Sequence, residues 1–310
     1  MTDIVPRPGN RTLFAAGLIL SYSALIGLID NFVQVIARDG GLWQFHVLRT
    51  VMACGILAVL ARPMGLRFAP RNRRAVAARS LVHATAMMIY FGGLAFLPVA
   101  EVAAGIFTAP IFVLLLSRFA YGRAIGPVRV GAVVAGFCGA VLVLGISPAL
   151  DLSPGLTLPV IGGAFYGLSN VATREWCPGE RAETLLLGFF LALGLFGLAG
   201  IAIIAVWQPP APAGAPGFLL RGLVWPTGPF LFWTLVQAAG SLVAVGLLVR
   251  AYQVAEASRV SVFEYAFLPM SAFWTWWLWG GTVAPAAALG MALIAAAGVA
   301  IALGGDGRAR

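Results

Sequence analysis

Residues 24–30 are ALIGLID and residues 164–170 are AFYGLSN, so two similar seven-residue segments occur, one in each half of the chain. The tripeptide VAE likewise occurs at residues 99–101 and again at 254–256. Each half also ends in a segment that begins with proline and carries two glycines: Pro127, Gly131 and Gly139, then Pro285, Gly290 and Gly298. Each half holds five apolar segments. An odd number of membrane crossings inverts the second copy, an arrangement typical of secondary transporters.

Composition predicts the class of protein. Hydrophobic residues make up 61% of the 310 residues and charged residues 10%, whereas soluble domains carry about 25% charged residues. The apolar residues come in continuous runs near the ~20 residues that a membrane-spanning helix requires. A β-barrel would need short alternating segments instead. The sequence therefore predicts an all-α polytopic membrane protein.

Ten transmembrane helices are expected, arranged as two inverted five-helix repeats. The first repeat occupies residues 1–150 and the second residues 151–310. The predicted spans are 12–36, 42–61, 79–97, 99–118, 127–146, 155–174, 183–207, 229–250, 256–279 and 283–304.

The arginines predict the orientation. All 20 basic residues are arginine, and all except Arg38, Arg49 and Arg221 lie on one side of the ten-span arrangement. Because cytoplasmic loops are enriched in basic residues, we expect both termini in the cytoplasm and the protein in the inner (plasma) membrane. This alternation of basic loops, without a contiguous basic patch, excludes a nucleic-acid partner.

Two stretches carry a family resemblance. They are Leu97-Pro98-Val99-Ala100-Glu101, which is followed by Thr108-Ala109-Pro110-Ile111-Phe112-Val113, and Phe263-Glu264-Tyr265 in the second half. With these stretches the chain resembles the drug/metabolite transporter (DMT) superfamily, in particular its EamA-type ten-helix transporters. The resemblance implies that spans one to four and six to nine surround a central pathway. It also implies that 127–146 and 283–304 pack outside it, within a monomer or as the contact of a homodimer.

Inserting an ionisable side chain into a membrane span costs about 2.5–3.5 kcal/mol of free energy, so each such residue is a candidate for a functional or a pairing role. Asp30 is a candidate for binding a substrate amine or a proton, or for pairing with Arg49. Its counterpart in the second repeat is Asn170, one turn after Tyr166. Glu264 lies too deep in its span to cap a helix, and burial favours the protonated form of a carboxylate, so a proton or a cation is its expected ligand.

His46 and Arg49 lie three residues apart on one helix face. The forked guanidinium of Arg49 suits a carboxylate or phosphate, although an ion pair with Asp30 is the favoured alternative. His83 is a candidate proton carrier or a packing residue. The remaining candidates for the pathway are Tyr90, Gln237, Tyr265 and Trp274.

Glu101 and Glu256 begin predicted spans, where a carboxylate offsets the helix dipole and caps free N–H groups. We therefore expect structural roles for both. The cysteines, Cys54, Cys138 and Cys177, have no metal-binding spacing, and neither a metal nor a cofactor is predicted.

The sequence thus predicts a secondary transporter that moves a small organic metabolite, amino acid-like or similar, by alternating access. An uptake carrier for a vitamin or nucleoside-like compound is the alternative. An intramembrane enzyme, a lipid-handling protein and a sensor are the rivals from other classes. No nucleotide-binding or hydrolase motif favours an ATP-driven pump or an enzyme.

Overall fold

The computed structural model describes residues 11–93, 99–145, 157–280 and 283–303, and among these residues all regular structure is helical. In chain order the elements are α1 (Arg11–Asp30), α2 (Val33–Asp39), α3 (Leu42–Ala61), α4 (Arg73–Gly93), α5 (Val99–Ile106), α6 (Ala109–Phe119), α7 (Pro127–Leu144), α8 (Thr157–Glu175), α9 (Ala182–Trp207), the 3₁₀ helix η3 (Ala215–Gly217), α10 (Gly228–Val254), α11 (Ala257–Phe263), the 3₁₀ helix η4 (Glu264–Ala266), α12 (Phe267–Trp279) and α13 (Pro285–Leu303).

Seven of the described helical segments are long and apolar enough to cross a membrane, which agrees with the predicted all-α polytopic class. They are Arg11–Asp39, Leu42–Ala61, Val102–Phe119, Pro127–Leu144, Ala182–Trp207, Gly228–Val254 and Pro285–Leu303. The helices outside this set are α4, which begins with arginines, α8, which carries Asn170 and Arg174, and the interrupted pair α11 and α12.

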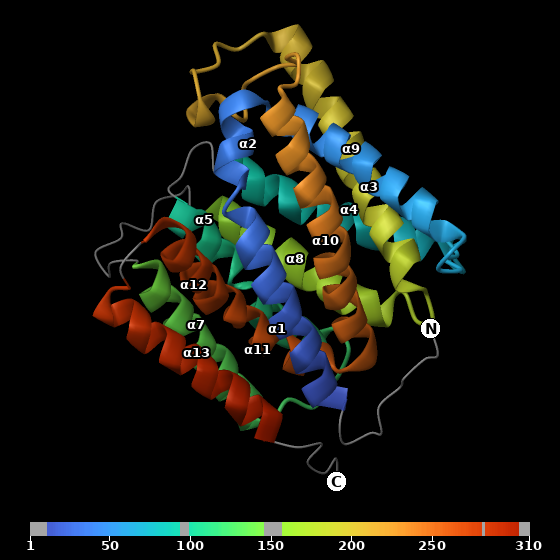
Figure 1. Ribbon diagram of the computed structural model, residues 1–310. Helices are drawn as coiled ribbons and strands as arrows, with labels where there is room; N and C mark the ends of the chain where they lie inside the picture. The colour runs from blue at the N-terminus through green and yellow to red at the C-terminus, as the bar shows by residue number, and fades with distance from the viewer. Residues whose placement is uncertain (1–10, 94–98, 146–156, 281–282, 304–310) are drawn as a thin grey trace.

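The helices pack across the two halves of the chain. Helix α1 contacts α10 and α12, helix α8 contacts α4 and α6, and α3 packs against α9. Helices α7 (green) and α13 (red) lie side by side along one edge of the molecule (Figure 1). The largest group of buried apolar residues draws on both halves, with Ile19 and Val113 from the first and Val171 and Leu248 from the second.

Glycines allow α7 and α13 to approach closely. A Cβ atom at Gly139 would lie 2.6 Å from the carbonyl oxygen of Gly290, and one at Gly290 would lie 2.5 Å from the carbonyl oxygen of Gly139. Small residues permit such contacts between helices in lipid. These two helices therefore pack together within one chain, and a homodimer through their outer faces stays a prediction.

Three of the predicted spans, 12–36, 99–118 and 256–279, are interrupted by breaks in the helix. Prolines account for two of the breaks, because a proline ring clashes with the carbonyl four residues earlier. Pro110 stands four residues after Ile106, where α5 ends, and Pro269 stands four residues after Tyr265 in η4. Between α1 and α2, the amide of Asn31 donates to the carbonyl of Gly27 at 2.6 Å.

The glycine contact predicts a difference between two substitutions in the same helix. Gly139→Ala should lower the free energy of unfolding by about 1–3 kcal/mol, because the new methyl group overlaps the backbone of α13. Gly131→Ala is the matched control, since a Cβ there meets nothing within 4 Å. Thermal unfolding of both variants in detergent measures the difference, and equal melting temperatures would contradict this packing.

Candidate functional site

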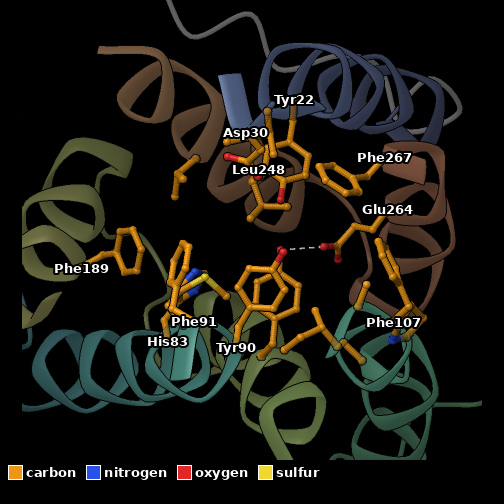
Figure 2. A pocket seen from close by; sticks show the side chains of 18 of the residues that line it. Tyr22, Asp30, His83, Tyr90, Phe91, Phe107, Phe189, Leu248, Glu264 and Phe267 are labelled. Atoms are coloured by element: carbon orange, nitrogen blue, oxygen red, sulfur yellow. Dashed lines mark hydrogen bonds between the residues drawn. The ribbon is translucent and has the colours of Figure 1, made fainter. Parts of the chain in front are cut away.

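A cavity lies among the helices of both halves of the chain (Figure 2). Its lining is mostly apolar and aromatic, with a few polar groups. The lining residues are Tyr22, Ile26, Asp30, Arg49, His83, Met87, Tyr90, Phe91, Ala103, Ile106, Phe107, Ala109, Pro110, Tyr166, Phe189, Val245, Leu248, Glu264 and Phe267.

Glu264 is at the centre of a hydrogen-bonded cluster. The Tyr166 hydroxyl donates to its Oε2 at 2.8 Å, and the Asn170 amide donates to its Oε1 at 3.2 Å. The Tyr252 hydroxyl also donates to Oε1. Glu264 as a whole is only 6% exposed, so these neutral donors replace water around its carboxylate. Tyr166, Asn170 and Glu264 were predicted to lie in the pathway, and the structure brings the three side chains together.

The broken span places this carboxylate. Glu264 follows the last residue of α11 and begins η4, where the backbone changes from α-helical to 3₁₀ geometry. The Glu264 side chain reaches into the cavity opposite Tyr90 and near Phe107 (Figure 2). The other two breaks also border the cavity, since Asp30 ends α1 and Phe107 lies between α5 and α6.

Asp30 and Arg49 both line the cavity, but the ion pairs among the described residues do not include the expected pair between them. Instead, one face of α10 separates them. Gln237 donates to Asp30 Oδ1 at 3.2 Å, and Arg49 Nε donates to Ser241 Oγ at 3.3 Å. The Ser241 hydroxyl in turn donates to the carbonyl of Gln237. The expectation of a direct ion pair is therefore wrong, because polar groups of α10 supply the nearer partners.

Gln237 lies behind the lining rather than in it. Its amide also donates to the carbonyl of Ile29 at 2.9 Å, so it supports the end of α1. Gln237, a predicted pathway residue, and Ser241, one turn later in α10, thus contact the lining residues Asp30 and Arg49, and neither lines the cavity itself.

The two histidines differ in their surroundings. His83 lines the cavity, its Nδ1 lies 3.0 Å from Ser169 Oγ, and its ring meets Tyr166 and Phe189 edge-on. Tyr90 lines the same wall. His46 is fully buried, is not among the lining residues, and neither ring nitrogen has a hydrogen-bond partner.

Tyr265 and Trp274 are not among the lining residues, which corrects their expected place in the pathway. The Tyr265 ring is buried against Phe107, with centroids 6.2 Å apart, and its hydroxyl has no partner. The Trp274 indole donates to the carbonyl of Ala24 at 2.8 Å, so it joins α12 to α1. Both residues are helix-packing residues here.

Glu101 and Glu256 were both predicted to cap the start of a helix, and the structure tests this role only for Glu256. Glu256 is the N-cap residue of α11, but its side chain makes no capping hydrogen bond. It pairs with Arg129 at 2.9 Å and with Arg259 at 3.5 Å instead, because these guanidinium groups offer stronger, charge-assisted partners. Glu101 falls within the first turn of α5, and its side chain is outside the described part of the structure.

Sequence reasoning missed several residues of the site. Tyr22 and Tyr252 approach Glu264 from α1 and α10, and the aromatic residues Phe91, Phe107 and Phe189 form much of the wall. Phenylalanines are common throughout this apolar chain, so no sequence signal separates those in the cavity from those facing lipid. Tyr252 was recognisable only as a polar group near the end of a span.

Arg79, the first residue of the predicted span 79–97, was not among the candidate site residues. It is 1% exposed between α4 and α8, and its Nε donates to Thr173 Oγ1 at 2.9 Å. Among the described residues, no group of three or more His, Cys, Asp or Glu residues is arranged to hold a metal ion.

Because Tyr252 donates a hydrogen bond to Glu264, we expect replacement of Tyr252 by phenylalanine to lower stability. The same replacement at Tyr265 should not. Tyr252→Phe should lower the free energy of unfolding by about 1–3 kcal/mol, because a buried carboxylate loses a donor. Tyr265→Phe is the control, since it removes a buried hydroxyl that has no partner. Chemical or thermal unfolding measures both variants. If the two are equally destabilised, the Tyr252 hydroxyl does not support Glu264.

Comparison with known proteins agrees with this architecture. Residues 13–145 match the model of the EamA-like transporter family. A riboflavin transporter of Rhizobium johnstonii is 30% identical over 72% of this chain and 68% of its own length. A riboflavin transporter of Vibrio cholerae is 23% identical over 93% of this chain and 91% of its own. A solved crystal structure with 18% identity shares the fold, with a TM-score of 0.75 over 96% of this chain and 99% of the other. The chain therefore belongs to the EamA-like transporter family of the DMT superfamily, and it is a multi-pass membrane transporter.

Proposed function

We propose that this protein is a secondary transporter for a planar, aromatic vitamin, with riboflavin as the first candidate, and that it works by alternating access. The observation that carries the proposal is the cavity, whose walls combine several aromatic side chains with aliphatic ones and whose charged groups are few and separated. The two relatives named riboflavin transporters support the vitamin alternative over the amino acid-like metabolite.

The aromatic wall suits a flat ring system. Tyr90, Phe91, Phe107, Phe189 and Phe267 come from both halves of the chain and surround the same space (Figure 2). Aromatic faces and edges bind other rings through stacked and edge-to-face contacts, and the apolar surface is removed from water at the same time. Both the ring contacts and the burial of apolar surface would favour binding of a flat heteroaromatic ring.

Polar groups stand at separate positions in this wall and would orient such a ring. Among the described residues, the one side-chain hydrogen bond of Arg49 is to Ser241, so other N–H groups of its guanidinium are available to carbonyl oxygens of a ligand. Asp30 accepts from Gln237 and has further acceptor capacity for ligand N–H or hydroxyl groups. A heterocycle with carbonyl and N–H edges and a hydroxylated chain matches these donors and acceptors.

One observation favours a second candidate, an amino acid-like zwitterion. Asp30 and Arg49 line one cavity without pairing directly, so an ammonium and a carboxylate group of one ligand would each find a charged partner. The aromatic wall would then restrict this ligand to a large apolar side chain. Competition between the two ligand classes decides between them.

Many transporters that work by alternating access are built from two related halves, and we propose the ten-span arrangement of two inverted repeats, residues 1–150 and 151–310. The contact pattern supports it, because exchanging the halves maps contacts onto contacts. The contact of α1 with α10 corresponds to that of α8 with α4, and the contact of α1 with α12 to that of α8 with α6. Helices α3 and α9, like α7 and α13, correspond to each other and are in contact.

Ion pairs join the halves at the end that we propose to be cytoplasmic. Arg123 pairs with Glu175 at 2.9 Å, and Arg129 binds both oxygens of Glu256 at 2.9 Å. The first turn of α1 and the last turn of α13 lie at the same end of the molecule in Figure 1, in keeping with both termini in the cytoplasm. Transport would require these pairs to separate when the cavity opens to that side.

Ligand binding provides the first test of this proposal. Riboflavin should raise the melting temperature of the purified transporter, because a ligand that binds the native state stabilises it. Phe189→Ala should weaken this binding by about 5- to 150-fold, since the loss of a buried aromatic contact costs on the order of 1–3 kcal/mol. Trp225→Ala, at a side chain that is 93% exposed, is the control. Amino acids tested as competitors assess the second candidate.

Transport itself is tested by counterflow in proteoliposomes. Vesicles loaded with unlabelled riboflavin should take up labelled riboflavin from outside and lose it as the internal pool equilibrates. Absence of counterflow with riboflavin, with related heteroaromatic compounds and with amino acids would contradict the transporter proposal as a whole.

Reporter fusions test the orientation. Green fluorescent protein fused after residue 310 should fluoresce and alkaline phosphatase fused there should be inactive, since basic loops face the cytoplasm. Alkaline phosphatase inserted within residues 209–214, a segment between α9 and η3, should be active in the periplasm or outside the cell. The reverse pattern would overturn the assignment.

A further inference from the structure

Glu264 is a buried carboxylate that has no cationic partner among the residues that the structure describes. The acidic residues in the ion pairs of the described chain are Glu175, Glu183 and Glu256, all at helix ends. Glu264 has three neutral donors instead: Tyr166, Tyr252 and Asn170. Keeping a negative charge out of water without a countercharge is costly even when hydrogen bonds are formed.

The charges of the cavity do not balance while both acids are ionised. Among its lining residues, Asp30 and Glu264 are acidic and Arg49 is basic, and His83 adds no charge while its imidazole is unprotonated. One bound proton makes the set neutral. Arg49 cannot supply this charge to Glu264 directly, since its nearest hydrogen-bond partner is Ser241 and its electrostatic partner is Asp30.

The groups that face Glu264 from the surrounding helices are also uncharged. Tyr22 comes from α1, Tyr166 and Asn170 come from α8, and Tyr252 comes from α10. Helix α7 brings Cys138 near the adjacent Tyr265, and its Arg129 is held by Glu256. Arg259 of α11 also contacts Glu256, while α12 and α13 contain no titratable residue.

The cluster has hydrogen-bond partners for both protonation states of Glu264. The ionised carboxylate accepts the three hydrogens described above. A protonated carboxyl must donate one hydrogen, and the buried Oδ1 of Asn170 has no partner in the structure. A rotation of the Asn170 amide would turn this acceptor toward the carboxyl group, and the tyrosine hydroxyls can likewise accept.

We propose that Glu264 binds a proton that moves across the membrane together with the substrate, so that the transporter is a proton symporter. This inference rests on the transport function proposed above and names its co-transported ion. The step is the reversible conversion of the Glu264 carboxylate and a proton into a carboxylic acid, with uptake from one side and release to the other. A proton suits this site better than a metal ion, because hydrogen-bond donors occupy the carboxylate and metal ions require additional oxygen ligands.

Substitution of Glu264 separates transport from coupling. Glu264→Gln keeps the shape and resembles the protonated acid, so proteoliposomes that contain this variant should retain riboflavin counterflow. They should fail to accumulate riboflavin when the outside is one pH unit more acidic, a gradient that allows the native protein up to about tenfold accumulation at one proton per substrate. Glu183→Gln, which removes an acid at the membrane surface, is the matched control and should accumulate normally.

The outcomes distinguish coupling from the proposed function. No counterflow in the native protein contradicts the transport proposal itself. Counterflow in the native protein without gradient-driven accumulation, or gradient-driven accumulation that persists in Glu264→Gln, overturns the proton site.

A second measurement applies if Glu264→Gln folds but does not transport. Downhill riboflavin movement through the native protein should alkalinise the compartment from which the substrate leaves, detected with a pH-sensitive dye inside the vesicles. Glu264→Asp should retain this proton movement with a shifted pH dependence of transport. No proton movement in the native protein, or an unchanged pH dependence in Glu264→Asp, would overturn the proposal.

Discussion

The absence of water in the membrane is the constraint on which the rest of the structure depends. Each backbone N–H and C=O group in the bilayer must find a partner within the protein, so a helix can be interrupted only where other parts of the protein surround it. The interruptions between α1 and α2, between α5 and α6, and at η4 all border one cavity. Breaking a helix there exposes polar backbone and redirects side chains, and this is how Asp30, Phe107 and Glu264 come to line the same space.

The same constraint separates the charged groups into two classes. At the helix ends, Arg123 and Arg129 form ion pairs that join the two halves of the chain. Within the bilayer, Glu264 is surrounded by neutral donors, and Asp30 is reached through an amide of α10. Ion pairs at the ends can break and be hydrated as a transporter changes state. A carboxylate among neutral donors can change its own charge, which makes it suited to a proton.

The polar site residues also explain which helices a simple measure of hydropathy overlooks. Helices α4 and α8 supply His83, Tyr90 and Tyr166 to the cavity, and neither is among the segments that are apolar enough to be recognised as spans. Helices that face lipid on most sides, such as α7 and α13, are recognised readily. Helices that line a pathway carry polar side chains and are therefore less hydrophobic. Composition alone therefore fails to identify as spans α4 and α8, which line the cavity.

The sequence by itself determined the class of protein, most helix positions and the family, because long apolar runs, arginine-rich loops and short sequence motifs are local properties of the chain. It also singled out Glu264, Tyr166 and Asn170, since polar side chains within apolar segments are conspicuous. Only the tertiary structure decided what those residues contact. It placed Gln237 and Ser241 between Asp30 and Arg49, brought Tyr252 to Glu264 and moved Tyr265 and Trp274 out of the cavity. The physical reason is that rotation and pairing of helices depend on packing between segments more than a hundred residues apart, which no local pattern encodes.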